Sequence, residues 1–177
     1  MMNSLLPLLK ISVRNGLIAG IFGTSLVVAL FYIGRHSFLI PVYFDFRIPL
    51  FGIFLFFTLK EYKSRIDDGI LYFWEGMAGS FSFLLGFSVL AAFGILIFGS
   101  LEDQFVPSYI SLFREQARTF PPEVIEKIGK ENFEKTLREL DSTTLLELIK
   151  TYIYQSFLIG FFVSIILSVI LRKQPKD

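Results

Sequence analysis

The sequence predicts an all-α integral membrane protein: four transmembrane helices with an amphipathic helical insertion between the third and fourth. Hydrophobic residues make up 53% of the 177 positions, and the mean hydropathy is +0.60. Charged residues make up 19%, below the roughly 25% of ordinary soluble domains, and they occur in blocks. Residues 76–101 contain no ionisable side chain, and about 20 mostly apolar residues suffice for a helix to cross a bilayer core.

We expect a single membrane domain covering residues 1–177. The spans are predicted at about residues 13–34, 46–62, 72–100 and 148–172, and residues 102–147 form the extramembrane helical insertion. Each span is expected to be helical because hydrocarbon offers no water to hydrogen-bond its backbone.

The first span follows from residues 15–34, which carry no charge and are bounded by Arg14 and Arg35. A basic flank before an apolar core also describes a secretory signal peptide. This core is longer than a signal-peptide core, and no clear A-x-A cleavage site follows it. We therefore favour a retained membrane helix.

The second span is less clear because only residues 49–59 are fully apolar. Proline favours the first turn of a helix, which predicts a helix start near Pro49, and Asp45 stands where a cap is expected. A re-entrant hairpin is the alternative, and we prefer a full crossing. Asp45 and Arg47 either pair or lie separately in the outer headgroups, and we favour the headgroups.

The third and fourth spans have long uncharged cores, at residues 76–101 and 151–171. Trp74 lies at the entry to the third span, and tryptophan favours the membrane–water boundary. Glu75 is the intramembrane charge candidate, because an acid inside a span is by default a functional residue. Its position beside Trp74 makes us favour the interface. Residues 151–171 form the core of the fourth span.

The insertion is predicted to contain several short helices. Pro107 suits the first turn of one, residues 120–122 end it, and Gly129 divides the following stretch. Acid-first pairs at i,i+4 spacing support the helices, namely Glu126/Lys130, Glu131/Lys135 and Glu134/Arg138. Thr144 and Glu147 match a capping box, so the last helix is expected to begin there and continue into the membrane.

The basic residues predict the orientation. Those on the side shared by the two termini and the second loop are Lys10, Arg14, Lys60, Lys63, Arg65, Arg172, Lys173 and Lys176. The first loop on the opposite side has only Arg35 and Arg47. Because basic residues of short loops stay in the cytoplasm, both termini are predicted to be cytoplasmic and the insertion to lie outside.

Small residues recur at four-residue spacing in three of the spans, which allows helix backbones to approach closely. The helix-packing candidates are Gly16, Gly20, Ala78, Ser82, Gly86, Ser156, Gly160, Ser164 and Ser168. They predict either a dimer or partner-binding face, or packing among the chain's own helices. We favour packing within the chain.

Catalytic chemistry has little support in the sequence. His36 is the only histidine and there is no cysteine, so no metal site is expected and no catalytic or cofactor-binding residue is assigned. No phosphate-binding glycine loop, H-E-x-x-H or G-x-S-x-G motif is present. The net charge of +1 gives no field that attracts nucleic acid. We expect a non-enzymatic protein without a cofactor.

Several short elements carry a resemblance. A charged Tyr-Lys element at residues 60–63 ends the second span, a Gly/Ser-rich third span follows, and Asp103 precedes Pro107. The last span closes on residues 171–173. This layout resembles the bacterial membrane-protein family catalogued as domain of unknown function 4199, although the spacing from Asp103 to Pro107 is wider than in the family pattern. The resemblance implies a four-span inner-membrane protein of Gram-negative bacteria and no known activity.

Two main functions are compatible with these features. The first is a structural or accessory subunit of the inner membrane, surrounded by lipid, that binds a protein partner or a second copy through its spans and the 102–147 block. The second is a small oligomeric transporter or channel lined by Glu75, Ser82, Gln155 and Ser156. An accessory role toward lipid- or glycan-processing enzymes is a weaker third. Nucleic acid is not expected as a partner.

Overall fold

The computed structural model describes residues 2–65 and 69–173, and their regular structure is helical. The α-helices are α1 (Met2–Tyr32), α2 (Arg47–Arg65), α3 (Phe73–Leu101), α4 (Phe105–Arg118), α5 (Pro122–Ile128), α6 (Lys130–Glu139) and α7 (Leu145–Leu171). Three short 3-10 turns complete the set: η1 (Ser37–Leu39), η2 (Val42–Phe44) and η3 (Leu140–Ser142). Among the described residues, β structure is limited to one isolated antiparallel bridge between Leu71 and Lys173.

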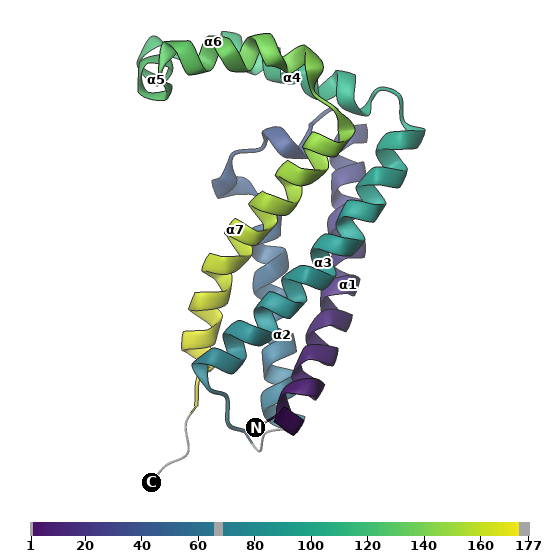
Figure 1. Ribbon diagram of the computed structural model, residues 1–177, viewed down its shortest axis with the longest axis vertical. Helices are drawn as coiled ribbons and strands as arrows, with labels where there is room; N and C mark the ends of the chain where they lie inside the picture. The colour runs from purple at the N-terminus through teal and green to yellow at the C-terminus, as the bar shows by residue number, and fades with distance from the viewer. Residues whose placement is uncertain (1, 66–68, 174–177) are drawn as a thin grey trace.

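Helices α1, α2, α3 and α7 form an up-and-down bundle (Figure 1). The start of α1 and the end of α7 lie at the same end of this bundle, as the orientation argument requires. Three helical segments are long and apolar enough to cross a membrane, namely Leu5–Tyr32, Phe73–Leu101 and Leu145–Leu171. The chain is therefore an all-helical protein with three candidate membrane-spanning helices, and α2 packs beside them.

Aromatic rings fill the centre of the bundle. Phe51 of α2 packs edge-on against Phe87 and Phe83 of α3, with ring centroids 4.7 and 6.0 Å apart. All three side chains have no exposed surface. Such pairs contribute about 0.5–1.5 kcal/mol each beyond area burial. In lipid this close packing replaces the hydrophobic effect as the main attraction between helices.

Helix α1 begins at Met2, well before the predicted span start at residue 13. Leu8 and Ser12 are fully buried, so tertiary contacts continue through this first part of the helix. Pro7 lies inside the helix, where it cannot donate an intrahelical hydrogen bond, so this part of α1 depends on the tertiary contacts of residues such as Leu8 and Ser12. Helix α2 begins at Arg47, close to the predicted start, and continues to Arg65.

The predicted helix boundaries at Pro107, Gly129 and Thr144 are confirmed. Pro107 is in the first turn of α4, and Gly129, with φ of +89°, separates α5 from α6. The Thr144 side chain accepts from the Glu147 backbone, and the Glu147 carboxylate accepts from the Thr144 backbone at 2.8 Å, which is the predicted capping box. Among the described residues, α6 forms the ion pair Lys135–Glu139, at 3.9 Å, and the predicted acid-first pairs are not within salt-bridge distance.

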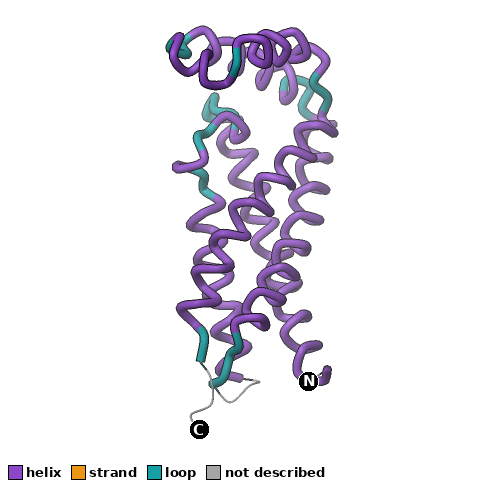
Figure 2. The backbone as a smooth tube through the Cα atoms, turned by 60° about the vertical axis from the view of Figure 1, so that its left-hand side comes forward, coloured by secondary structure: helices purple, strands orange, loops and turns teal. Residues whose placement is uncertain are grey.

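Helices α4, α5 and α6 make a helical arm that lies across one end of the bundle (Figures 1 and 2). Helix α4 runs outward, α5 turns the chain and α6 returns to α7. Arg114 of α4 pairs with Asp141 of η3, and the Phe120 and Phe133 rings pack 6.1 Å apart. The arm is thus a helical hairpin closed by its own contacts.

Candidate functional site

A buried ion pair joins Asp45 and Arg47 inside the bundle. Asp45 lies just before α2 and Arg47 is its first residue, and each side chain is 3% exposed. The Nε atom of Arg47 donates to both carboxylate oxygens of Asp45, at 2.9 and 3.0 Å, and an Nη atom forms a further contact. Asp45 also accepts from the Arg47 backbone N–H at 2.9 Å, so it caps the start of α2.

The remaining Arg47 donors reach α7. They donate to the Tyr152 carbonyl at 3.1 Å, the Ser156 hydroxyl at 3.0 Å and the Gln155 side-chain oxygen at 2.8 Å. The guanidinium also lies 4.6 Å from the centre of the Tyr152 ring. We call Asp45, Arg47, Tyr152, Gln155 and Ser156 the Arg47 cluster.

The Arg47 cluster joins the start of α2 to α7. All five N–H donors of a guanidinium are engaged here, so Arg47 has none left for a ligand. Placing Asp45 and Arg47 separately in the outer headgroups was wrong, because they pair inside the bundle. Burying two charges is costly unless their hydrogen bonds are satisfied, and α7 supplies the missing acceptors.

The residues considered as a transport path are not brought together. Gln155 and Ser156 belong to the Arg47 cluster, in the first half of α7. Glu75 lies at the other end of the bundle, where it is 4% exposed and accepts from the Tyr72 backbone at 3.0 Å and the Tyr62 hydroxyl at 3.3 Å. Ser82 is half-buried and donates to the Ala78 carbonyl of its own helix.

Glu75 is the third residue of α3, and its carboxylate caps the helix N-terminus. A negative side chain there is favourable because the helix dipole and free backbone N–H groups attract it. This geometry gives Glu75 a structural role at a helix end.

The small-residue candidates mostly face neighbouring helices of the same chain. Buried members are Gly16, Gly20, Gly86, Ser156, Gly160, Ser164 and Ser168, and half-buried members are Ala78 and Ser82. A Cβ on Gly16 would lie 2.2 Å from the Phe83 carbonyl oxygen, and one on Gly86 would lie 2.7 Å from the Val13 carbonyl oxygen. Glycine at both positions lets the α1 and α3 backbones touch.

Glycines also allow close contact between α3 and α7. A Cβ on Gly160 would lie 2.3 Å from the Leu84 side chain, and one on Gly76 would lie 2.6 Å from the Ser168 hydroxyl. The Ser164 hydroxyl donates to the Gly160 carbonyl at 2.6 Å, which removes a polar group from the apolar interior.

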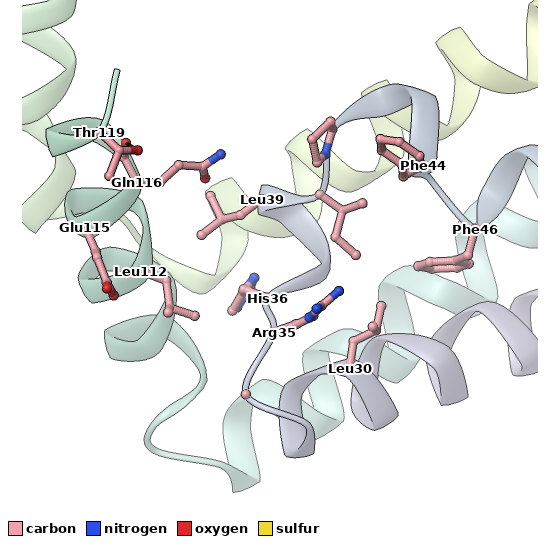
Figure 3. Close-up of a pocket in the computed structure, with 13 residues that line it drawn as sticks. Leu30, Arg35, His36, Leu39, Phe44, Phe46, Leu112, Glu115, Gln116 and Thr119 are labelled. Atoms are coloured by element: carbon pink, nitrogen blue, oxygen red, sulfur yellow. Dashed lines mark hydrogen bonds between the residues drawn. The ribbon is translucent and has the colours of Figure 1, made fainter. Parts of the chain in front are cut away.

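A groove of about 700 Å³ lies between the arm and the bundle (Figure 3). It is lined by Leu30, Gly34, Arg35, His36, Leu39, Ile40, Pro41, Phe44, Phe46, Leu112, Glu115, Gln116 and Thr119. The first nine come from the end of α1 and the connection to α2, the next three from α4, and Thr119 directly follows α4. We call this feature the interfacial groove, because α1 is a candidate span that ends beside it.

His36 connects the groove wall to the arm. Its ring is 3% exposed, packs 4.8 Å from the Phe105 ring and 5.2 Å from the Tyr109 ring, and its Nε2 lies 3.3 Å from the Phe105 carbonyl oxygen. That distance fits Nε2–H as the donor, which assigns the tautomer. Burial lowers the His36 pKa to about 4, so the ring is neutral at pH 7.

Comparison with known proteins identifies the family. The model of a family described as "Protein of unknown function (DUF4199)" matches residues 14–173. The chain belongs to this family. No curated protein and no solved structure matches the chain. In this DUF4199 protein the matched region covers most of α1 and all of α2 to α7. It therefore includes both the Arg47 cluster and the interfacial groove.

The sequence indicated some parts of these sites. An ion pair between Asp45 and Arg47 is one of the two interpretations that the sequence allows. The α7 partners of Arg47 are more than 100 residues away along the chain, so the sequence does not indicate them. The interfacial groove in this DUF4199 protein was not predicted at all. Its only sequence signals are Pro41, the aromatic residues between positions 38 and 46, and the single histidine.

Proposed function

We propose that this chain is a non-enzymatic accessory subunit of the bacterial inner membrane, in which α2 is a fourth crossing and the helical arm binds a protein partner. The observation that carries the proposal is the arm. None of the described side chains of α5 and α6 is buried, although α4 of the same arm is anchored through the ring contacts of Phe105 and Tyr109 with His36. An exposed yet anchored helical hairpin has the geometry of a docking element.

The fourth crossing is supported by the length and surface of α2. Nineteen helical residues extend about 28 Å at about 1.5 Å per residue, close to the roughly 30 Å hydrocarbon core. One face of α2 is buried at Phe51 and Leu55, and the opposite face exposes Ile53 (57%) and Phe57 (60%). Large exposed apolar side chains in this position suit contact with lipid.

The proposed orientation places both termini in the cytoplasm and the arm outside. It is supported by the start of α1 and the end of α7, which lie at the same end of the bundle, and by the basic residues predicted on that side. Lys63 also donates to the Leu171 carbonyl at 2.8 Å there, so a cation caps the end of α7.

Transport is the alternative, and the interior of the bundle argues against it. Glu75 is in the first turn of α3 and Arg47 is in the first turn of α2, and the packed rings of Phe51, Phe83 and Phe87 lie between them. A solute would have to displace these rings. Proteoliposome flux that is lost in Glu75→Gln would favour transport over the accessory role.

Site-specific photo-crosslinking tests the accessory role. A photoreactive residue at the exposed Glu134 of α6 should give a covalent adduct with one membrane protein in cells, because α6 faces the partner. The same group at Phe57, on the lipid-facing side of α2, is the matched control and should give none. A Glu134 position that yields no adduct, together with a monomeric particle free of other proteins after mild extraction, would contradict the proposal.

A further inference from the structure

The interfacial groove combines apolar walls with two separated charges. Leu30, Leu39, Ile40 and Phe46 are half-buried and form apolar walls. Phe44 marks an open edge, since its side chain is 79% exposed. An exposed apolar edge beside the end of a candidate span lies where acyl chains reach the headgroup region.

The two charges do not neutralise each other. Arg35 lies three residues after the end of α1, and Glu115 lies on α4 of the arm. No ion pair joins either side chain to another described residue, and both are exposed. Figure 3 shows them on opposite sides of the groove, Arg35 beside the bundle and Glu115 on the arm.

This order of charges matches one kind of lipid. In a zwitterionic aminophospholipid the phosphate is next to the glycerol and acyl chains, and the ammonium group is at the outer tip. Arg35, near the end of the membrane helix, is placed to bind the phosphate through a charge-assisted hydrogen bond. Glu115, on the arm, is placed to bind the ammonium group, while the carboxamide of Gln116 and the hydroxyl of Thr119 offer neutral contacts.

We propose that the interfacial groove binds one phospholipid with an ethanolamine headgroup. The acyl chains lie against the apolar walls near Phe44 and Phe46, Arg35 contacts the phosphate and Glu115 contacts the ammonium group. This inference concerns the face of α4 that lines the interfacial groove, and it does not depend on a protein partner for α6. The bound lipid would add contacts between the arm and the bundle.

Native mass spectrometry of the detergent-purified protein tests the proposal. Phosphatidylethanolamine and phosphatidylglycerol with identical acyl chains are titrated separately, and soluble phosphoethanolamine is the headgroup probe. We expect a single adduct with about tenfold preference for phosphatidylethanolamine, the size of one charge-assisted hydrogen bond. Equal affinity for the two lipids, or equally tight binding of phosphoethanolamine alone, would overturn the proposal.

Charge-removing variants separate the two contacts. Glu115→Gln should abolish the headgroup preference and leave phosphatidylglycerol binding unchanged, whereas Arg35→Gln should weaken both lipids about tenfold. Matched controls are Glu134→Gln on α6 and Arg172→Gln at the other end of the bundle, which should behave as wild type. Melting temperatures of all variants show whether the fold is retained.

A groove-filling variant tests the acyl-chain contact independently of charge. Leu39→Trp places a larger side chain on the apolar wall and should reduce the binding of both lipids, with the preference for ethanolamine retained in the residual binding. Unchanged affinity in Leu39→Trp, or an unchanged preference in Glu115→Gln, would contradict the assigned site.

Discussion

Gly16 of α1 and Phe83 of α3 are in direct backbone contact, because a Cβ on Gly16 would lie only 2.2 Å from the Phe83 carbonyl oxygen. A backbone atom cannot move away as the end of a flexible side chain can. The close approach of the two helices therefore depends on the absence of a side chain at this position.

Gly16→Ala is expected to destabilise the bundle by about 1–3 kcal/mol, the usual cost of overpacking. The measurement is thermal unfolding of the detergent-solubilised protein. Gly52→Ala in α2 is the matched control, since a Cβ there meets nothing within 4 Å. It should be neutral or slightly stabilising because alanine favours helix. Equal melting temperatures for the two variants would contradict the packing described for α1 and α3.

Arg47→Met should destabilise the protein by about 3–5 kcal/mol, because it leaves the Asp45 carboxylate buried without its partner. Asp45→Asn combined with Arg47→Met removes both charges and should recover part of this loss. A double-mutant cycle of melting free energies gives the coupling between the two residues. Additive effects would contradict a stabilising interaction between the two charges.

Acidification should destabilise the contact between the arm and the bundle through His36. The folded-state pKa is about 4, below the ordinary 6.5, so the unfolded chain binds the proton more readily. The stability contributed by neutral His36 is fully present above pH 6.5 and is lost as the pH falls toward 4. Melting temperatures of wild type and His36→Phe across pH 4 to 8 measure this difference.

The phenylalanine ring retains the packing against Phe105 and Tyr109 but cannot titrate, so His36→Phe should show a smaller fall in stability at low pH. Carboxylates titrate in both proteins, and the comparison removes their contribution. Parallel pH profiles would mean that the His36 ring accepts a proton in the folded protein without penalty.

Local features were predictable from the sequence, and contacts between distant segments were not. The Thr144–Glu147 cap and the break at Gly129 depend on residues within one turn, so their residue types are sufficient to predict them. The early start of α1 depends on the burial of Leu8 against residues of other segments, such as Leu59 and Leu71, which are distant in the sequence. Span length and composition could be read directly for α1, α3 and α7.

The candidate sites show the same division. Arg47 was visible as a charge near a span, but its contacts with Tyr152 and Ser156 require α2 and α7 to be neighbours. The interfacial groove requires α4 to fold back over residues 34–46. Charge spacing within one segment carries no information on either arrangement.

The number and direction of the crossings is the central claim, and single-cysteine labelling tests it most directly. The chain has no native cysteine, so Tyr43→Cys, Ser64→Cys, Glu134→Cys and Arg172→Cys can be labelled one at a time at exposed positions. A membrane-impermeant maleimide applied to intact spheroplasts should label positions 43 and 134, and positions 64 and 172 only after lysis. Labelling of 43 and 64 from the same side would contradict a crossing by α2 and with it the four-span account.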